Sequence, residues 1–405
     1  KWSLNDDGDW IEISTSKIVV KVNSLNGSIN FYDKEGNLLL NEINEGGKSI
    51  SSVEVMGEST YNVRQIFNSP KDEAFYGLGA HQNGIMNYKG EDVDLWQYNI
   101  VNAMPFLLSN KNYGILWDNN SRTKFGDIRE YKSISSLKLF NKNGKEEGLS
   151  AEYFKDEKFT ELFISRSESR IEHEFIDVND DYPEGFEQNV KAIRWSGEIE
   201  ANQSGLHKFR LYSSGYIKVW LDGKLMCDAW RQNWLPWTHI FRLEMEKGKR
   251  YPIVIEWIHT GGYIGFKYLP PDPFENKDHL SLWSEVGDQI DYYFIYGKNP
   301  DEIIKGYRLI TGKAPMIPKW SLGFWQSREH YKTQEELLSV VQEFRDRQIP
   351  IDNIVQDWFY WKEDLWGSHE FDPVRFPDPK GMVEKLHNEL HTRIMISVWP
   401  KFYVG

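Results

Sequence analysis

Cysteine is the rarest residue of this 405-residue sequence, and Cys227 is its one example. A single cysteine excludes an internal disulfide framework and a cysteine metal cluster, and it leaves the redox compartment undetermined. Because unpaired cysteine behaves as a small hydrophobic residue, we expect Cys227 to be buried in a core.

Long apolar runs and basic clusters are also missing. No stretch approaches the roughly 20 apolar residues that cross a bilayer, so we expect no membrane-spanning segment. The net charge of −13 argues against nucleic acid as a partner, because that interaction requires clustered Lys and Arg. A neutral substrate fits better. Aromatic residues are abundant at 15%, with 17 Trp, and the length predicts two or three domains in a soluble, globular chain.

The signatures of several enzyme classes do not occur. The chain has no G-x-G-x-x-G or P-loop after a predicted parallel strand and no G-x-S-x-G elbow, which argues against nucleotide binding and serine hydrolysis. One H-x-x-x-H pair, His387 and His391, contains Asn388 where a zinc protease has its general-base Glu. We interpret this pair as a solvated helix end, and we expect no cofactor and no metal.

Short alternating segments with turns between them fill most of the chain. Residues 1–148 have the pattern of a β-meander and predict the first part of an N-terminal β-sandwich. Residues 149–272 predict a second all-β unit, which begins after the polar run NKNGKEEG. Strand-like alternation resumes in residues 273–314, so we expect the second unit to be inserted into the sandwich, with a linker after it.

Residues 315–405 change to the pattern β-α-β-α-β. WSLGFW, IDNIVQ and RIMISVWP read as strands; a T-x-x-E capping box at Thr333 opens the first helix, and Asp378 with Pro379 opens the second. These segments predict parallel strands with right-handed crossovers and the first three strands and two helices of a (β/α)8 barrel. Since a complete barrel needs about 250 residues, we expect the chain to be the first part of a longer enzyme.

Polar and aromatic residues follow each of the three predicted barrel strands, as QSREHY, QDWFYW and WPKFY. The carboxyl ends of barrel strands line active sites, and aromatic rings beside a carboxylate are suited to a sugar. Core packing of Trp358 and Trp399, with Asp357 as a helix cap, explains the same spacing equally well.

Trp230, Trp234 and Trp237 lie close together in the predicted insertion. If the rings are exposed, they are suited to glycan contact; if they are buried, they close the end of a small β-barrel. The burial reading is slightly favoured, and Trp230 and Trp234 are the candidates for glycan contact.

Several segments together resemble glycoside hydrolase family 31. PMIPKWSLGFWQS and FDPVRFPDPKGMVEKLH resemble the start of the family's catalytic barrel, YGLGAHQNGIMNYKG and YGILWDNNSRTKFGD resemble its N-terminal β-sandwich, and the insertion resembles a protective-antigen-type carbohydrate-binding module. The resemblance implies a retaining α-glycosidase with two catalytic aspartates, as in other retaining glycosidases. It places both after the third strand, beyond Gly405, so neither Asp357 nor Asp364 is expected to be the nucleophile, and this chain alone should be inactive.

The resemblance also implies a subsite for the terminal sugar. Asp357 matches the aspartate that accepts hydrogen bonds from sugar hydroxyls, while Trp358 and Trp399 match positions that line the pocket. Phe359 is a further candidate. The list is completed by His330 in REHY, which has no certain family counterpart, and by Asn99 in the sandwich loop.

A bulky Trp358 would fill the space of the hydroxymethyl group that glucose has and xylose lacks. We therefore expect an α-xylosidase that trims xyloglucan oligosaccharides. Separately, we expect a secreted, periplasmic or cell-surface location rather than a cytoplasmic one. An α-glucosidase or transglucosylase of the same family, or a non-catalytic carbohydrate-binding protein, remain as alternatives. The oligomeric state is left open.

Overall fold

The computed structural model describes residues 1–45, 47–97, 101–173, 182–272 and 278–399. The chain divides into two compact units, Lys1–Thr311 and Gly312–Gly405. Among the described residues, no helix is long and apolar enough to cross a membrane.

The first unit begins with a five-stranded antiparallel meander in the order β1-β2-β3-β4-β5. The strands are β1 Ser3–Asp6, β2 Trp10–Ser14, β3 Ile18–Asn23, β4 Ile29–Asp33 and β5 Leu38–Asn41. Phe31 and Leu40 of this sheet are buried in the same hydrophobic core as the sandwich that follows.

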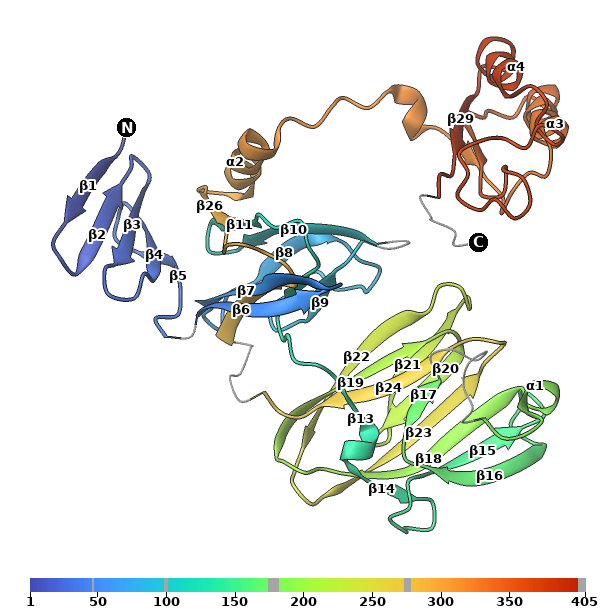
Figure 1. Cartoon of the computed structure of the whole chain (residues 1–405), viewed down its shortest axis with the longest axis horizontal. Helices are drawn as coiled ribbons and strands as arrows, with labels where there is room; N and C mark the ends of the chain where they lie inside the picture. The colour runs from blue at the N-terminus through green and yellow to red at the C-terminus, as the bar shows by residue number, and fades with distance from the viewer. Residues whose placement is uncertain (46, 98–100, 174–181, 273–277, 400–405) are drawn as a thin grey trace. The chain divides into compact units, whose positions relative to one another are not determined.

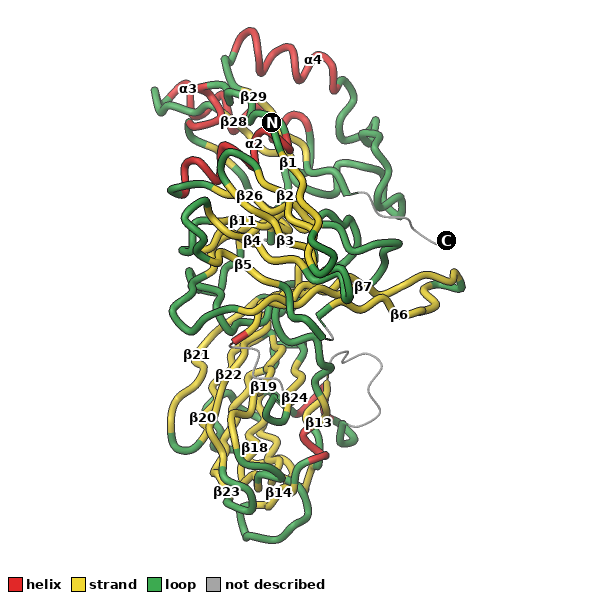
Figure 2. Tube along the Cα trace, turned by 90° about the vertical axis from the view of Figure 1, so that its left-hand side faces the viewer, coloured by secondary structure: helices red, strands yellow, loops and turns green. Residues whose placement is uncertain are grey.

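Two further sheets form the sandwich, in the orders β6-β7-β25-β12-β9 and β26-β11-β10-β8. Their bounds are β6 Lys48–Val55, β7 Glu58–Asn68, β8 Phe75–Ala80, β9 Val93–Leu95, β10 Asn102–Ser109, β11 Tyr113–Trp117, β12 Thr123–Phe125, β25 His279–Ser284 and β26 Tyr292–Tyr296. Strands β25 and β26 come from after the insertion and pair with β7 and β11 (Figure 1). The predicted β-sandwich with an inserted all-β module is therefore confirmed. In Figure 2 the β6–β7 hairpin extends past the other strands of its sheet.

The inserted module consists of two antiparallel sheets, whose main paths are β13-β24-β19-β22 and β16-β15-β18-β23-β20-β21. Its elements are β13 Lys132–Ser133, β14 Lys138–Asn141, β15 Leu149–Phe154, β16 Leu162–Glu168, β17 Ile171–His173, α1 Phe186–Asn189, β18 Ala192–Glu200, β19 Gly205–Ser213, β20 Gly215–Leu221, β21 Lys224–Arg231, β22 Trp237–Met245, β23 Arg250–Ile258 and β24 Ile264–Leu269. Trp195 and Trp257 are fully buried in its core.

Two features of the module bear on the sequence predictions. Cys227 is 7% exposed within this core, as expected, and burial raises its pKa to about 11. Strands β13 and β14 pair with β24 and β18, so residues ahead of position 149 already contribute to the module's sheets. Their pairing was not visible in the sequence because two- and four-residue strands carry too little periodicity.

A cluster of buried charges joins the module to the sandwich. Lys208 of β19 places its Nζ 2.6 Å from Asp92 Oδ2 and 3.5 Å from Asp127 Oδ2. Arg129 pairs with Asp127 at 2.6 Å, and Arg242 of β22 pairs with Glu91 at 2.7 Å. Burial would raise the pKa of Asp127, but the hydrogen bond from Arg129 and the charge of Lys208 outweigh it and lower this pKa.

The first unit ends with helix α2, Pro300–Thr311. Gly312 follows with a φ of +88°, a left-handed conformation that ends helices and that glycine adopts without steric cost.

The second unit contains three parallel strands, β27 Trp325–Gln326, β28 Asn353–Gln356 and β29 Arg393–Ile396, in the order β27-β28-β29. Helices α3 Gln334–Asp346 and α4 Pro379–Glu384 connect them, and α4 continues as a π-helical turn, Lys385–Glu389. The β-α-β-α-β prediction is confirmed. Both predicted caps are present, because the side chain of Thr333 accepts from Glu336 N and that of Asp378 accepts from Gly381 N.

The strand predicted for WSLGFW is mostly wrong. Lys319–Leu322 form a 3-10 turn, and only Trp325 of this segment is in β27. The turn is stabilised by the hydroxyl of Ser321, which donates to Pro318 O at 2.7 Å, and by Gly323 N, which donates to Trp320 O at 3.1 Å. Local hydrogen bonds of this kind compete with strand pairing.

Candidate sugar-binding site

The predicted site residues of the second unit follow the carboxyl ends of its strands. His330 lies in the loop after β27, Asp357, Trp358 and Phe359 come directly after β28, and Trp399 follows β29. Because the three strands are parallel and adjacent, these loops emerge at one edge of the sheet.

Aromatic rings connect these positions into one cluster. His330 contacts Trp358 and Phe359 edge-on, with centroid distances of 5.6 and 5.9 Å. Trp358 lies 5.1 Å from Trp366, and Trp366 lies 5.3 Å from Trp399. The structure therefore brings together all the barrel residues predicted for the site, with Trp366 as the link to Trp399.

Exposure differs across this cluster. Trp358 and Phe359 are half-buried, Trp399 is 39% exposed, and Tyr360 and Trp361 are fully buried behind them. Half-buried rings held by buried neighbours present one face to solvent in a fixed orientation, which is what stacking on the apolar face of a pyranose requires.

The carboxylate of Asp357 is oriented by the backbone of the next residue. Its Oδ1 accepts a hydrogen bond from the backbone N–H of Trp358 at 2.7 Å, and the carboxylate is partly exposed. The alternative of a helix cap is excluded, because the segment that follows is a loop leading to α4 at Pro379. A fixed, partly exposed carboxylate beside aromatic rings is able to accept hydrogen bonds from hydroxyl groups of a neutral ligand.

Two residues of the site were missed in the sequence. Trp366 lies nine residues beyond Asp357 in a loop with no periodicity, and only the fold returns it to Trp358. Arg375 places its guanidinium 4.9 Å from the ring centroid of Phe359. Its position in FDPVRFPDP was a signal of family resemblance, but that motif did not reveal which side chains it contacts.

Asn99 lies outside the described residues. Of the same sandwich loop, Gln97 is described: its amide donates to Val101 O, and its Oε1 accepts from Ala103 N at 3.1 Å. The role of Asn99 stays a prediction.

Of the three tryptophans considered in the inserted module, two are exposed and one is buried. Trp230 and Trp234 are 48% and 71% exposed, while Trp237 is 7% exposed. Tyr216 of β20, itself 54% exposed, lies opposite Trp230 in the strand register with a ring distance of 6.1 Å. Tyr216 and Trp230 therefore form an exposed ring pair on β20 and β21, and Trp234 is exposed in the loop that follows.

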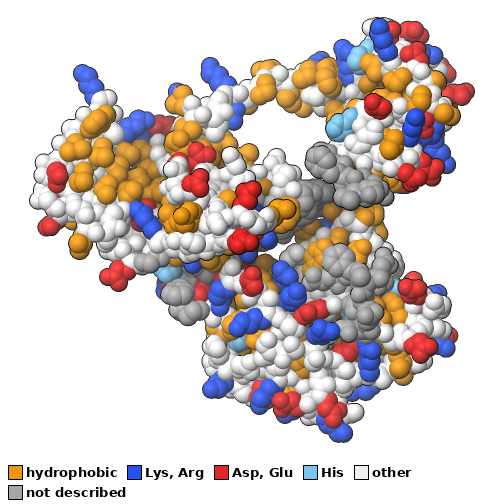
Figure 3. Space-filling view, in the orientation of Figure 1, with side chains coloured by type: hydrophobic (Ala, Val, Ile, Leu, Met, Phe, Trp, Pro, Cys, Tyr) orange, Lys and Arg blue, Asp and Glu red, His pale blue; other side chains and the backbone are white. Residues whose placement is uncertain are grey.

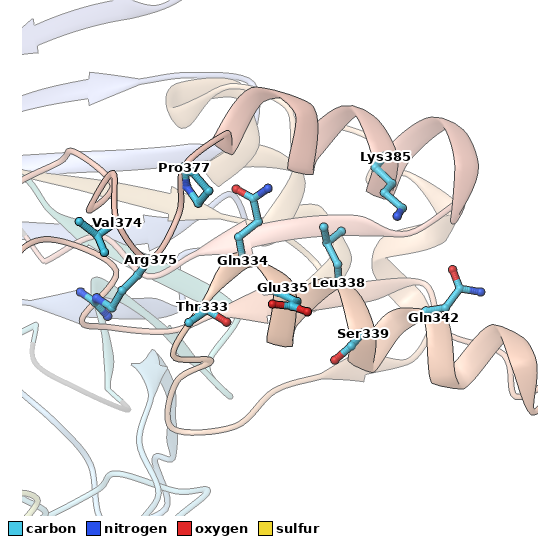
Figure 4. A pocket seen from close by; sticks show the side chains of 10 residues that line it. All are labelled: Thr333, Gln334, Glu335, Leu338, Ser339, Gln342, Val374, Arg375, Pro377 and Lys385. Carbon is cyan, nitrogen blue, oxygen red and sulfur yellow. The ribbon is translucent and has the colours of Figure 1, made fainter.

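The strand ends of the second unit are the best candidate for the site. A groove of about 510 Å³ is lined by residues of α3 and its cap and by Val374, Arg375, Pro377 and Lys385 (Figure 4), but none of the predicted sugar-binding residues lines it. Within the described ranges, no three His, Cys, Asp or Glu side chains are grouped to hold a metal ion.

These features define a class of protein: a β-sandwich with an inserted β module that precedes the opening strands of a β/α barrel. Comparison with known families then identifies the domains. Residues 1–125 match the glycosyl hydrolase 31 N-terminal galactose mutarotase-like domain, residues 145–272 match the PA14 domain, and residues 314–404 match the glycosyl hydrolases family 31 TIM-barrel domain. The chain belongs to glycoside hydrolase family 31.

Known relatives agree with this assignment. The crystal structure of an α-xylosidase from Xanthomonas citri is 44% identical, matches 100% of this chain and 44% of its own, and superimposes with a TM-score of 0.90. An α-xylosidase from Saccharolobus solfataricus is 52% identical over 31% of this chain and 17% of its own length. An α-glucosidase 2 from Bacillus thermoamyloliquefaciens is 36% identical over 31% of this chain and 16% of its own. The chain thus spans less than half the length of each of these relatives.

Proposed function

We propose that this chain is the N-terminal part of a retaining α-xylosidase that removes non-reducing terminal α-xylose from xyloglucan oligosaccharides. The observation that carries the proposal is the end of β28, where Asp357 is followed by the ring cluster of Trp358, in a chain similar along its whole length to the X. citri α-xylosidase. Fold alone would not indicate a substrate; the carboxylate and the rings do.

The reaction itself is assigned to two aspartates that we place after Gly405. In a retaining glycosidase one carboxylate attacks the anomeric carbon, and the other protonates the leaving oxygen and then activates water, with about 5–5.5 Å between them. Exposed apolar residues on and after β29 support further barrel strands beside it, since Met395, Ile396 and Val398 are 49%, 38% and 49% exposed. Figure 3 likewise shows apolar side chains at the surface of the segment that follows α2.

In this scheme Asp357 accepts hydrogen bonds from sugar hydroxyls, and Trp358 determines the size of the sugar. His330, Phe359 and Trp366 surround Trp358 with centroid distances of 5.1 to 5.6 Å, so its indole cannot rotate away without displacing them. A fixed indole excludes an exocyclic hydroxymethyl group more effectively than a mobile one.

Substrate preference tests the proposal. We expect the full-length enzyme to hydrolyse an aryl α-xyloside with a kcat/KM roughly 10–200-fold above that for the matching α-glucoside, because one small group in an apolar site contributes about 1–3 kcal/mol. Trp358→Ala should narrow this ratio by raising glucoside activity. Trp2→Ala, at a tryptophan that is 69% exposed and lies just ahead of β1, is the matched control.

Two outcomes would contradict this scheme. A preference for the glucoside would favour an α-glucosidase or transglucosylase, in line with the similarity to α-glucosidase 2. If Trp358→Ala lowers kcat/KM equally for both substrates, the indole stacks on the sugar and does not select it by size.

We further propose that the exposed rings of the inserted module bind the xyloglucan chain. Trp230→Ala with Trp234→Ala in the full-length enzyme should weaken retention in a xyloglucan-containing native gel roughly tenfold, because two stacking surfaces are lost. Trp2→Ala again serves as the control. Unchanged retention would remove these tryptophans from glycan recognition.

A further inference from the structure

The loop between β28 and α4 has a strained point next to the proposed sugar site. Phe359 adopts a φ of +64°, the left-handed region that a bulky aromatic residue rarely enters because its side chain is strained there. Such a conformation persists only when its surroundings hold it. The Phe359 backbone directly follows Asp357 and Trp358, so what holds it also determines where these two side chains point.

The guanidinium of Arg375 supplies this restraint. Its Nη1 donates to Phe359 O at 2.8 Å and its Nη2 donates to Trp361 O, so one side chain binds the carbonyls on both sides of Tyr360. The same group lies over the Phe359 ring at 4.9 Å. Three contacts of this guanidinium therefore hold Phe359 and Trp361.

Asp372 orients the guanidinium from the other side. Arg375 Nε donates to Asp372 Oδ2 at 2.8 Å, and the two side chains are 22% and 13% exposed. The hydrogen bond from Arg375 lowers the pKa of Asp372 and thereby favours the carboxylate form that accepts it. Asp372 N also donates to Tyr360 O at 2.8 Å, which ties the two halves of the loop together.

The backbone of Arg375 is anchored to a helix. Its carbonyl accepts from Gln334 N in the first turn of α3 at 2.9 Å, and the Gln334 side chain accepts from Asp378 N at 3.0 Å. Figure 4 shows Arg375, Pro377 and Gln334 together at the start of α3. The loop is thus held in place through Arg375 by α3, a helix that is capped by the side chain of Thr333.

We propose that Arg375 is a positioning residue that fixes the loop after β28 and thereby sets the affinity of the sugar site at Asp357 and Trp358. This inference rests on the proposed sugar-binding function of that loop. An arginine is required because its planar fork reaches two carbonyls and a carboxylate at once, whereas a lysine ammonium is a single point.

The test is Arg375→Lys in the full-length enzyme, assayed on whichever aryl α-glycoside the wild type cleaves best. We expect KM to rise roughly tenfold or more with kcat within about threefold, because a displaced loop weakens ground-state and transition-state binding alike. Competitive inhibition by the free sugar should weaken by the same factor. Arg347→Lys, at the exposed arginine that follows the last residue of α3 and pairs with Glu343, is the matched control.

Two further variants make the test independent of folding defects. Asp372→Asn leaves both carbonyl hydrogen bonds in place and should raise KM about two- to fivefold. Adding Phe359→Gly to Arg375→Lys should recover part of the lost affinity, because glycine adopts a positive φ without strain.

The results separate this inference from the proposed function. If Arg375→Lys and Asp372→Asn both keep the wild-type KM and inhibition constant, the positioning role is overturned, even if the thermal midpoint falls. If the wild type prefers a sugar other than xylose but Arg375→Lys still raises its KM, the α-xylosidase proposal fails and the positioning role stands.

Discussion

Replacing Asp357 with alanine is expected to lower the kcat/KM of the full-length enzyme for an aryl α-xyloside by roughly 10²–10⁴-fold. The carboxylate would accept hydrogen bonds from two sugar hydroxyls, and each bond to a charged acceptor contributes about 1.5–3 kcal/mol. Asp357→Asn keeps an acceptor oxygen of the same shape and should lose less. The free energy of unfolding should change little, because Asp357 is partly exposed and its bond within the fold is to Trp358 N.

The control for this experiment lies in the same loop. Asp364 is exposed and has a φ of +64°, so Asp364→Asn preserves a residue that tolerates the left-handed conformation and should stay close to wild-type activity. Azide offers a second check, because it rescues glycosidases that lack their nucleophile by attacking the anomeric carbon itself. If azide restored the activity of Asp357→Ala, Asp357 would be the nucleophile. That result would contradict its assignment as the acceptor of hydrogen bonds from sugar hydroxyls.

Replacing Lys208 with methionine is expected to destabilise the first unit by about 3–5 kcal/mol, the usual cost of removing one partner from a buried ion pair. Lys208 is 9% exposed at its side chain, and Asp92 and Asp127 would lose the cation they share. Arg129 still pairs with Asp127, so Asp92 would bear the larger cost. Differential scanning calorimetry should show that the midpoint temperature for unfolding of the first unit falls by roughly 5–15 °C.

Two companion variants show whether charge is the cause. Lys218→Met removes an exposed lysine of the same module that pairs with Asp228 at 3.3 Å, and it should change stability by less than about 1 kcal/mol. Lys208→Met combined with Asp92→Asn should recover part of the loss, since the unpaired charge is removed as well. A stability unchanged in Lys208→Met would mean that water or neighbouring groups solvate both carboxylates.

Much of the local structure of the barrel segment was predictable because its signals lie within a few residues of each other. Thr333 and Asp378 cap the two helices as their sequences indicate, and the apolar side chains of Leu337, Met382 and Leu386 are buried. Caps and periodicity act through the nearest turn, so they need no knowledge of the remaining chain. The placement of Asp357 at a strand end follows from the same local pattern.

Long-range contacts set the limit of prediction. The 3-10 turn at Lys319–Leu322 replaces most of an expected strand, and Phe324 N donates to Asp352 Oδ2, 28 residues away, at 3.0 Å. The spacing of Trp230, Trp234 and Trp237 slightly favoured burial of the group, whereas in the structure only Trp237 is buried among these three. Burial of a loop aromatic depends on strands far along the chain, which single-residue patterns do not encode.

The sequence by itself determined the order of domains, the parallel β-α-β-α-β segment, its helix caps and the position of Asp357 and Trp358 after a strand, because each follows from turn chemistry, periodicity or resemblance along adjacent residues. Only the tertiary structure decided that Trp366 joins Trp358 to Trp399, that Arg375 holds the strained Phe359, and that Lys208 shares its charge between Asp92 and Asp127. These contacts depend on the distances between loops that folding brings together, and such distances are a property of packing rather than of neighbouring residues.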